Sequence, residues 1–168
     1  MREVDEQPAQ GASYSASRDK KEQATFTVSP LPKGRQLTGP AAADGLAAAL
    51  NALALDDVRK AASHADAPRS RAVFHTFDGL EVDLAGRKDG THSLVAISAR
   101  STAAPSAAEA QELDARFKGW EFEIPDYKYT AIFSPLDELL QKPAEPVKKT
   151  ATAKGSARTA ARAAAAAK

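Results

Sequence analysis

The sequence predicts an α+β fold in which an antiparallel sheet packs with two to three helices. One observation is Asp78-Gly79 between two alternating segments, a dipeptide typical of a β-hairpin. A second is the run of good helix formers over residues 105–118. A third is the loss of large apolar side chains after Lys142, which predicts a disordered basic tail.

Composition shifts divide the chain into three parts. Residues 1–10 are polar and are expected to be frayed. Residues 11–142 are expected to form a single α+β domain. Residues 143–168 are rich in alanine, lysine and arginine and have no apolar face to dock, so we expect a flexible tail. The tail carries six basic residues and one acid, whereas the rest of the chain is mildly acidic.

Overall composition excludes several kinds of site. The 168 residues contain no cysteine, so a disulfide framework, a thiolate zinc site and a cysteine nucleophile are all excluded. No stretch reaches the roughly 20 apolar residues that cross a bilayer. The start, Met1 to Gln10, is charged where a secretion signal would be apolar, so the chain as written is expected to be cytoplasmic.

The first elements are short strands and one helix. Residues 12–17 and 24–29 favour strands separated by a charged turn. Gly39-Pro40 then opens a helix in which three leucines share one face. These leucines are Leu46, Leu50 and Leu53.

The next segments predict a three-stranded antiparallel meander over residues 72–99. A two-residue type I′ turn at Asp78-Gly79 would join its first two strands. That pairing places six side chains on one apolar face: Val73, His75, Phe77, Leu80, Val82 and Leu84. A second turn over residues 87–90 leads into residues 92–99, which are expected to be buried on both faces.

The last part of the domain alternates between helix and strand. Residues 105–118 form the expected helix, and Gly119 is its expected stop. Residues 120–125 alternate apolar and acidic side chains, which predicts a half-buried strand. Residues 126–140 favour helix, but Pro135 predicts a kink or a second short helix with Ser134 as its N-cap.

Several of these strings together resemble a known family. The strings are Phe26-Thr-Val, Leu31-Pro-Lys-Gly-Arg, residues 49–58, Thr76-Phe-Asp-Gly-Leu, residues 119–129 and residues 136–140. In order and spacing they resemble the C-terminal half of the bacterial family called domain of unknown function 4340, over roughly residues 11–141.

Members of that family typically carry an N-terminal membrane anchor and an extracytoplasmic body, and tend to be encoded beside ABC transporter components of the gliding-motility type. The resemblance therefore implies a non-catalytic binding or scaffolding module, accessory to a bacterial transport or motility system. It also implies protein partners in a membrane transport assembly and an extracytoplasmic, membrane-anchored location. The family supplies no accepted catalytic residues, so none is assigned here.

Catalytic and metal motifs are not found in the sequence. It has three histidines, but no nucleophile elbow, no phosphate-binding glycine loop and no histidine pair at metal-ligand spacing. We expect no enzyme activity, no cofactor and no small-molecule substrate. His75 is expected to be a structural histidine on the apolar hairpin face, and His64 and His92 are expected to be solvated.

The acidic and the aromatic side chains near the predicted strands each allow two interpretations. The acids Asp78, Glu81, Asp83, Glu121 and Glu123 could form a paired-carboxylate site, but an exposed sheet face explains them more simply. The aromatic residues Trp120, Phe122, Tyr127 and Tyr129 could form a binding surface, but a core role is favoured. In that core role, the hydroxyls of Tyr127 and Tyr129 would reach the rim as protein contacts.

The basic tail is the source of the alternative function. Lys148, Lys149, Lys154, Arg158 and Arg162 are candidate contacts to nucleic acid or to anionic lipid. A nucleic-acid-associated protein that binds through this tail, weakly and without reading sequence, is therefore the alternative to a protein-binding module. A merely solubilising tail is the simpler explanation of the same residues.

Overall fold

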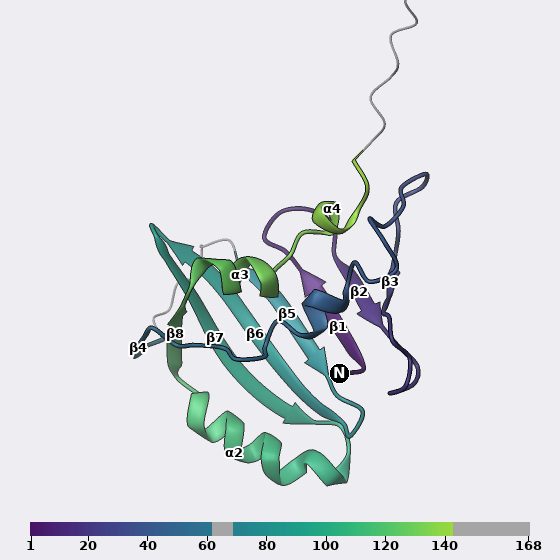
Figure 1. Ribbon diagram of the computed structural model, residues 1–168. Helices are drawn as coiled ribbons and strands as arrows, with labels where there is room; N and C mark the ends of the chain where they lie inside the picture. The colour runs from purple at the N-terminus through teal and green to yellow at the C-terminus, as the bar shows by residue number, and fades with distance from the viewer. Residues whose placement is uncertain (62–68, 143–168) are drawn as a thin grey trace, which may run out of the picture.

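The computed structural model describes residues 1–61 and 69–142. They form an eight-stranded antiparallel sheet in the order β3-β2-β1-β5-β6-β7-β8-β4 (Figure 1). The strands are β1 (Glu3–Gln7), β2 (Tyr14–Ser17), β3 (Thr27–Ser29), β4 (Asp57–Lys60), β5 (Ser70–His75), β6 (Leu80–Asp89), β7 (His92–Ser101) and β8 (Trp120–Ile124). The helices are α1 (Asp44–Ala47), the 3-10 turn η1 (Ala104–Ser106), α2 (Ala107–Phe117), α3 (Asp126–Ile132) and α4 (Leu136–Leu139). The α+β class is therefore confirmed, with four short α-helices in the described part rather than two to three.

One face of the sheet carries the core. Side chains from all four α-helices or their ends, such as Leu46, Phe117, Ile132 and Leu136, pack with the apolar side chains of this face. The chain after α3 lies close to the sheet at Gly86 on β6, where an added Cβ would overlap the ring of Phe133. We call this side the helix face and the opposite side the polar face.

The N-terminal segment is not frayed. β1 lies inside the sheet, paired with β2 on one side and with β5 on the other. Val4 is fully buried opposite Phe74. The prediction for residues 1–10 was wrong because two neighbouring strands satisfy the backbone hydrogen bonds of this polar segment, and the partner β5 comes much later in the chain.

The meander over β5, β6 and β7 is confirmed, but the register of its first hairpin differs. His75 pairs with Glu81 rather than with Val82. The Thr76 N–H donates to the Leu80 carbonyl (2.9 Å), so three residues lie in the loop. Gly79 has a φ of 89°, whereas Asp78 does not have the positive φ that a type I′ turn requires.

This one-residue difference exchanges the two faces of β5. Ala72 and Phe74 are buried on the helix face, together with Leu84 on β6. Val73 and His75 lie instead on the polar face, because side chains alternate along a strand. The predicted apolar face was therefore wrong for Val73 and His75.

The third strand of the meander matches the prediction in its centre. Leu94 and Val95 are both fully buried although they point to opposite faces. Ser98 is exposed, so burial on both faces does not extend along the whole strand. The second turn is tight, with Asp89 paired directly with His92.

The segment after Gly39-Pro40 differs most from expectation. Its α-helix is α1 alone, and the first of the three leucines expected on one helix face, Leu46, is buried. Leu50 lies in the turn that follows, Leu53 lies in the loop after that turn, and both are partly buried. The next residues form β4, a strand that the sequence pattern did not predict because its side chains are mostly charged.

The C-terminal elements follow the prediction closely. α2 ends at Phe117 and is followed by Gly119 with a φ of 82°. Pro135 separates α3 from α4, as expected for a residue that cannot continue a helix. Pro135 itself is the N-cap of α4, so Ser134 is not the cap.

Other predictions fall on segments that the structure does not describe. The tail residues Lys148, Lys149, Lys154, Arg158 and Arg162 and the histidine His64 lie outside the described residues. Within the described residues, no helix has the length and apolar character that crossing a membrane requires.

Candidate functional site: the polar face of the sheet

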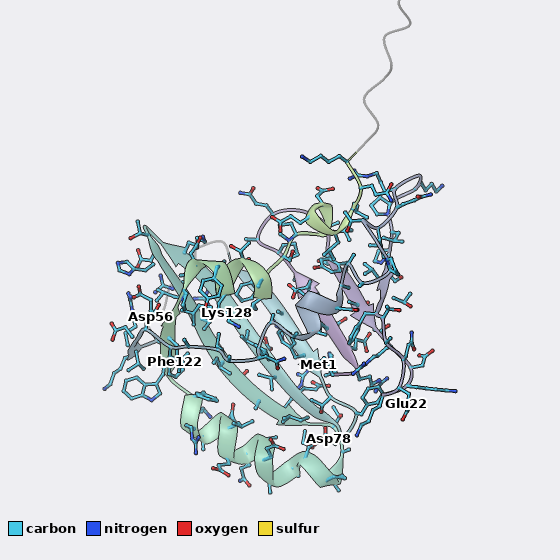
Figure 2. All side chains as sticks on the ribbon, viewed as in Figure 1. Met1, Glu22, Asp56, Asp78, Phe122 and Lys128 are labelled. Atoms are coloured by element: carbon cyan, nitrogen blue, oxygen red, sulfur yellow. The ribbon has the colours of Figure 1, made fainter. Side chains whose placement is uncertain are left out.

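The polar face carries charged side chains from six strands that bond to one another across the sheet. Acidic side chains of one strand lie beside basic side chains of the next, so most of the ion pairs join neighbouring strands. The charged members are Asp5, Arg59, Arg71, His75, Glu81, Asp83, Arg87, Asp89, His92, Arg100, Glu121 and Glu123. Figure 2 shows the side chains on both faces of the sheet and on the surrounding loops.

His75 lies between two carboxylates on this face. Its Nε2 is 3.0 Å from Asp5 Oδ2, and its Nδ1 is 3.2 Å from Glu81 Oε1. A neutral imidazole has one N–H, so the protonated ring is the form that donates to both carboxylates. Both ring nitrogens face carboxylate oxygens, so neither is directed at a substrate proton, which makes this arrangement a poor general base.

Glu81 is the shared acid of this cluster. The sequence pattern placed it on an exposed face, but it is buried because Arg100 and His75 bond it from the neighbouring strands. Burial alone would raise its pKa, but the hydrogen bonds and charges of Arg100 and His75 outweigh burial and lower the pKa of Glu81. Glu81 is therefore held ionised, as an acceptor rather than as an acid catalyst.

A second buried pair joins β6 to β8. The Arg87 Nε lies 3.1 Å from Glu121 Oε1, and the Arg87 Nη2 lies 2.8 Å from Glu121 Oε2. The two side chains are each 7% exposed. The expectation of an exposed Glu121 was therefore wrong, because a bidentate arginine on β6 covers its carboxylate.

Further ion pairs lie in the centre of this face and at its β4 end. Arg71 bonds Asp83 in a fork, with Nε 3.0 Å from Oδ1, and this raises the pKa of Arg71. Glu123 accepts from Arg59 (3.1 Å) and contacts His92 (2.7 Å). His92 is exposed, as expected for a solvated histidine, although it has this acidic neighbour.

The five predicted acids are thus not brought together as a catalytic pair. Asp83, Glu121 and Glu123 are each bonded to an arginine. Asp78 lies in the hairpin loop, where the Thr76 hydroxyl lowers its pKa. Among residues 1–61 and 69–142, no group of three or more histidine, aspartate or glutamate side chains is placed to hold a metal ion.

The two tyrosines expected at the rim behave differently. Tyr127 on α3 is 68% exposed, so it is available to a partner. Tyr129 is buried, with its ring 4.7 Å from that of Phe133 and a side-chain hydrogen bond to Ser70. Residues two positions apart in a helix point in different directions, which explains why one tyrosine is at the surface and the other is in the core.

The other two aromatic residues divide in the same way. Phe122 is buried against Phe117, with the rings at right angles and 5.5 Å apart. Trp120 is 39% exposed because it lies opposite Lys60 on the edge strand β4. The favoured core role is therefore correct for Phe122 and Tyr129 but wrong for Trp120 and Tyr127.

Glu6 is a buried acid that sequence reasoning missed. It points to the helix face from β1, between Tyr14 on β2 and Ala72 on β5. Neither carboxylate oxygen has a hydrogen-bond partner in the described part of the chain. Burial, with a smaller contribution from Asp5, raises the pKa of Glu6 to about 9, so the carboxyl is protonated at neutral pH.

A shallow groove lies between α2 and the end of β7. Its volume is about 420 Å³, and it is lined mainly by small side chains such as Ala99, Ala107 and Ala110. Arg100 and Lys118 lie at this groove together with Asp114. It is open to solvent and has no buried polar group aimed into it, so it does not define a ligand.

Comparison with known proteins gives no relative. No family model matches the chain, and neither the curated proteins nor the solved structures contain a significant match. The resemblance to domain of unknown function 4340 therefore stays a prediction.

Proposed function

We propose that the chain is a non-catalytic binding or scaffolding module that presents the polar face of its sheet to a protein partner. The observation that carries this proposal is the set of ion pairs that fixes charges of both signs across one face. The strands hold these side chains in place before binding, so a partner with the complementary charge order meets a preorganised surface.

The chemistry of the face supports binding over catalysis. Arg100 and His75 both contact the Glu81 carboxylate and favour its ionised form. A catalytic acid–base pair needs two groups whose pKa values are pushed apart around the working pH. Here the nearby cations lower the pKa of Glu81 and so keep it from acting as an acid.

The class of partner follows from the family resemblance, on which this part of the proposal rests. We propose an accessory role beside a bacterial ABC-type transport or motility system. The experiment is co-purification of the chain with the transporter subunits encoded nearby, after mild crosslinking in the native host. Arg71→Glu is the informative variant, because Arg71 is half-exposed in the centre of the polar face and pairs with Asp83.

The matched control is Arg116→Glu, which makes the same charge change on the exposed surface of α2. We expect Arg71→Glu to reduce co-purification by about tenfold and Arg116→Glu to leave it unchanged. Equal recovery of both variants would contradict a role for the polar face. DNA binding that is lost when residues 143–168 are deleted would instead support the tail as the functional element.

A further inference from the structure

Strand β4 forms one end of the sheet, and no other described strand lies on its outer side. In the described part of the chain it pairs with β8 and with no other strand (Figure 1). The Ala61 N–H donates to Gly119, so the alternate backbone groups of Val58 and Lys60 face away from β8. In agreement, the Val58 N–H is bonded by the side chain of Asp57 rather than by a strand (2.8 Å).

Exposed apolar side chains gather at this end of the sheet. Val58 is 52% exposed and Leu55 is 46% exposed, and both lie at or next to β4. Val58 lies on the helix face, opposite the buried Phe122 and diagonal to Trp120. Figure 2 shows Asp56, the residue that precedes this strand, at the same outer edge near Phe122.

The charges around Val58 are ordered so that the strand is complementary to itself. Asp56 and Asp57 precede Val58, and Arg59 and Lys60 follow it. In an antiparallel pair of two identical strands centred on Val58, each acid comes opposite a base of the other strand. Asp57 meets Arg59 on the polar face. Asp56 precedes the strand and donates its N–H to the Glu123 carbonyl (2.8 Å), so only its carboxylate comes near Lys60 of the other copy.

We propose that two copies of this chain associate through β4, with a two-fold axis at Val58, so that their sheets join into one continuous sheet. The two Val58 residues then form a hydrogen-bonded pair across the axis, and their side chains meet on the helix face beside Trp120. This contact lies at the β4 edge and shares Arg59 with the polar face proposed above for a different partner.

Charged side chains often protect an edge strand, but here they do not oppose a second copy. Protection by charge requires that like charges meet when two edges approach. The order of acids and bases around Val58 brings unlike charges together instead. The opposite edge, β3, has three residues and is followed directly by Pro30, which is a common way to block an edge.

The helices leave room for this association. α2 packs mainly on β7 and β6, away from β4. Arg59 already bonds Glu123 (3.1 Å) and is a third exposed, so Asp57 of the other copy would join an existing ion pair. A contact of this small size predicts a weak dimer whose population depends on concentration.

The test is sedimentation velocity of the full chain over a range of concentrations up to about 0.5 mM. Lys60→Glu and Asp56→Lys each place like charges opposite each other twice in the dimer. We expect each variant alone to self-associate about tenfold more weakly than the unsubstituted chain. An equimolar mixture of the two restores all the charge pairs, so it is expected to dimerise again.

Two controls and one backbone variant complete the experiment. Lys33→Glu and Asp19→Lys make the same charge changes at exposed positions away from β4 and are expected to leave the dimer unchanged. Val58→Pro removes the outward N–H without touching the bonds to β8, and is expected to abolish the dimer while circular dichroism confirms the fold. A chain that stays monomeric at every concentration, or a mixture that does not recover the dimer, would overturn the proposal.

Discussion

Arg87 and Glu121 reach each other across β7 and form a buried, bidentate ion pair. On β7, Leu94 pairs with Arg87 and Ala96 pairs with Glu121, so the guanidinium reaches the carboxylate diagonally across this strand. These hydrogen bonds raise the pKa of Arg87. The pair therefore ties the centre of the meander to the strand that follows α2.

Removal of one partner of this pair should destabilise the protein strongly. We expect Arg87→Met to lower the free energy of unfolding by about 3 kcal/mol, because Glu121 loses its buried cation. The measurement is urea denaturation followed by circular dichroism. The control, Arg116→Met, breaks an exposed pair on α2 and should change the stability by less than about 0.5 kcal/mol. Equal effects of the two substitutions would contradict the importance of burial.

Glu6 should make the folded state less stable as the pH rises. Its pKa is raised to about 9 in the folded protein, from an ordinary value of 4.5, so the folded state binds the proton more tightly than the unfolded state does. Its contribution to stability is complete below pH 4.5 and is lost as the pH rises toward 9.

The corresponding variant is Glu6→Gln, which keeps the shape of the side chain without its charge. Between pH 5 and pH 8 the unsubstituted chain should lose on the order of 3 kcal/mol relative to this variant. Urea denaturation at several pH values measures the difference. Glu22→Gln, at an exposed position, retains Glu6 and should retain the loss. A parallel pH profile for Glu6→Gln and the unsubstituted chain would refute a protonated Glu6.

Gly86 should be intolerant of any side chain. A Cβ at this position would overlap the ring of Phe133, so we expect Gly86→Ala to cost about 2 kcal/mol. Gly45 in α1 has no neighbouring atom in the way, and Gly45→Ala should be neutral or stabilising by up to about 1 kcal/mol. Thermal unfolding of both variants checks the prediction, and Phe133→Leu should partly rescue Gly86→Ala. No difference between the two glycines would show that Phe133 can move away freely.

The sequence was sufficient for the fold class and for the elements with strong local signals. The meander and α2 are encoded by alternation, helix periodicity and glycine turns, which act over short distances. The split between α3 and α4 likewise follows from one residue, Pro135. The alternation that includes Glu121 and Glu123 also predicted that one face of the sheet is polar.

Features that depend on distant partners were not predictable in the same way. β1 and β4 are polar segments whose partners, β5 and β8, follow much later in the chain. The hairpin register depends on a single loop residue. β5 has apolar residues at both even and odd positions, so the alternation of its side chains did not show which face is buried. The burial of Glu81, Glu121 and Glu6 depends on neighbours that only the assembled sheet supplies.

The position of β4 also affects how the chain can fold during synthesis. Its partner β8 is translated only after the whole meander and α2 have emerged, so a nascent chain carries this strand with both backbone edges free. Its charged side chains help to keep such a strand in water until β8 arrives. β4 can therefore join the sheet only after β8 has been synthesised, when most of the domain already precedes it in the nascent chain.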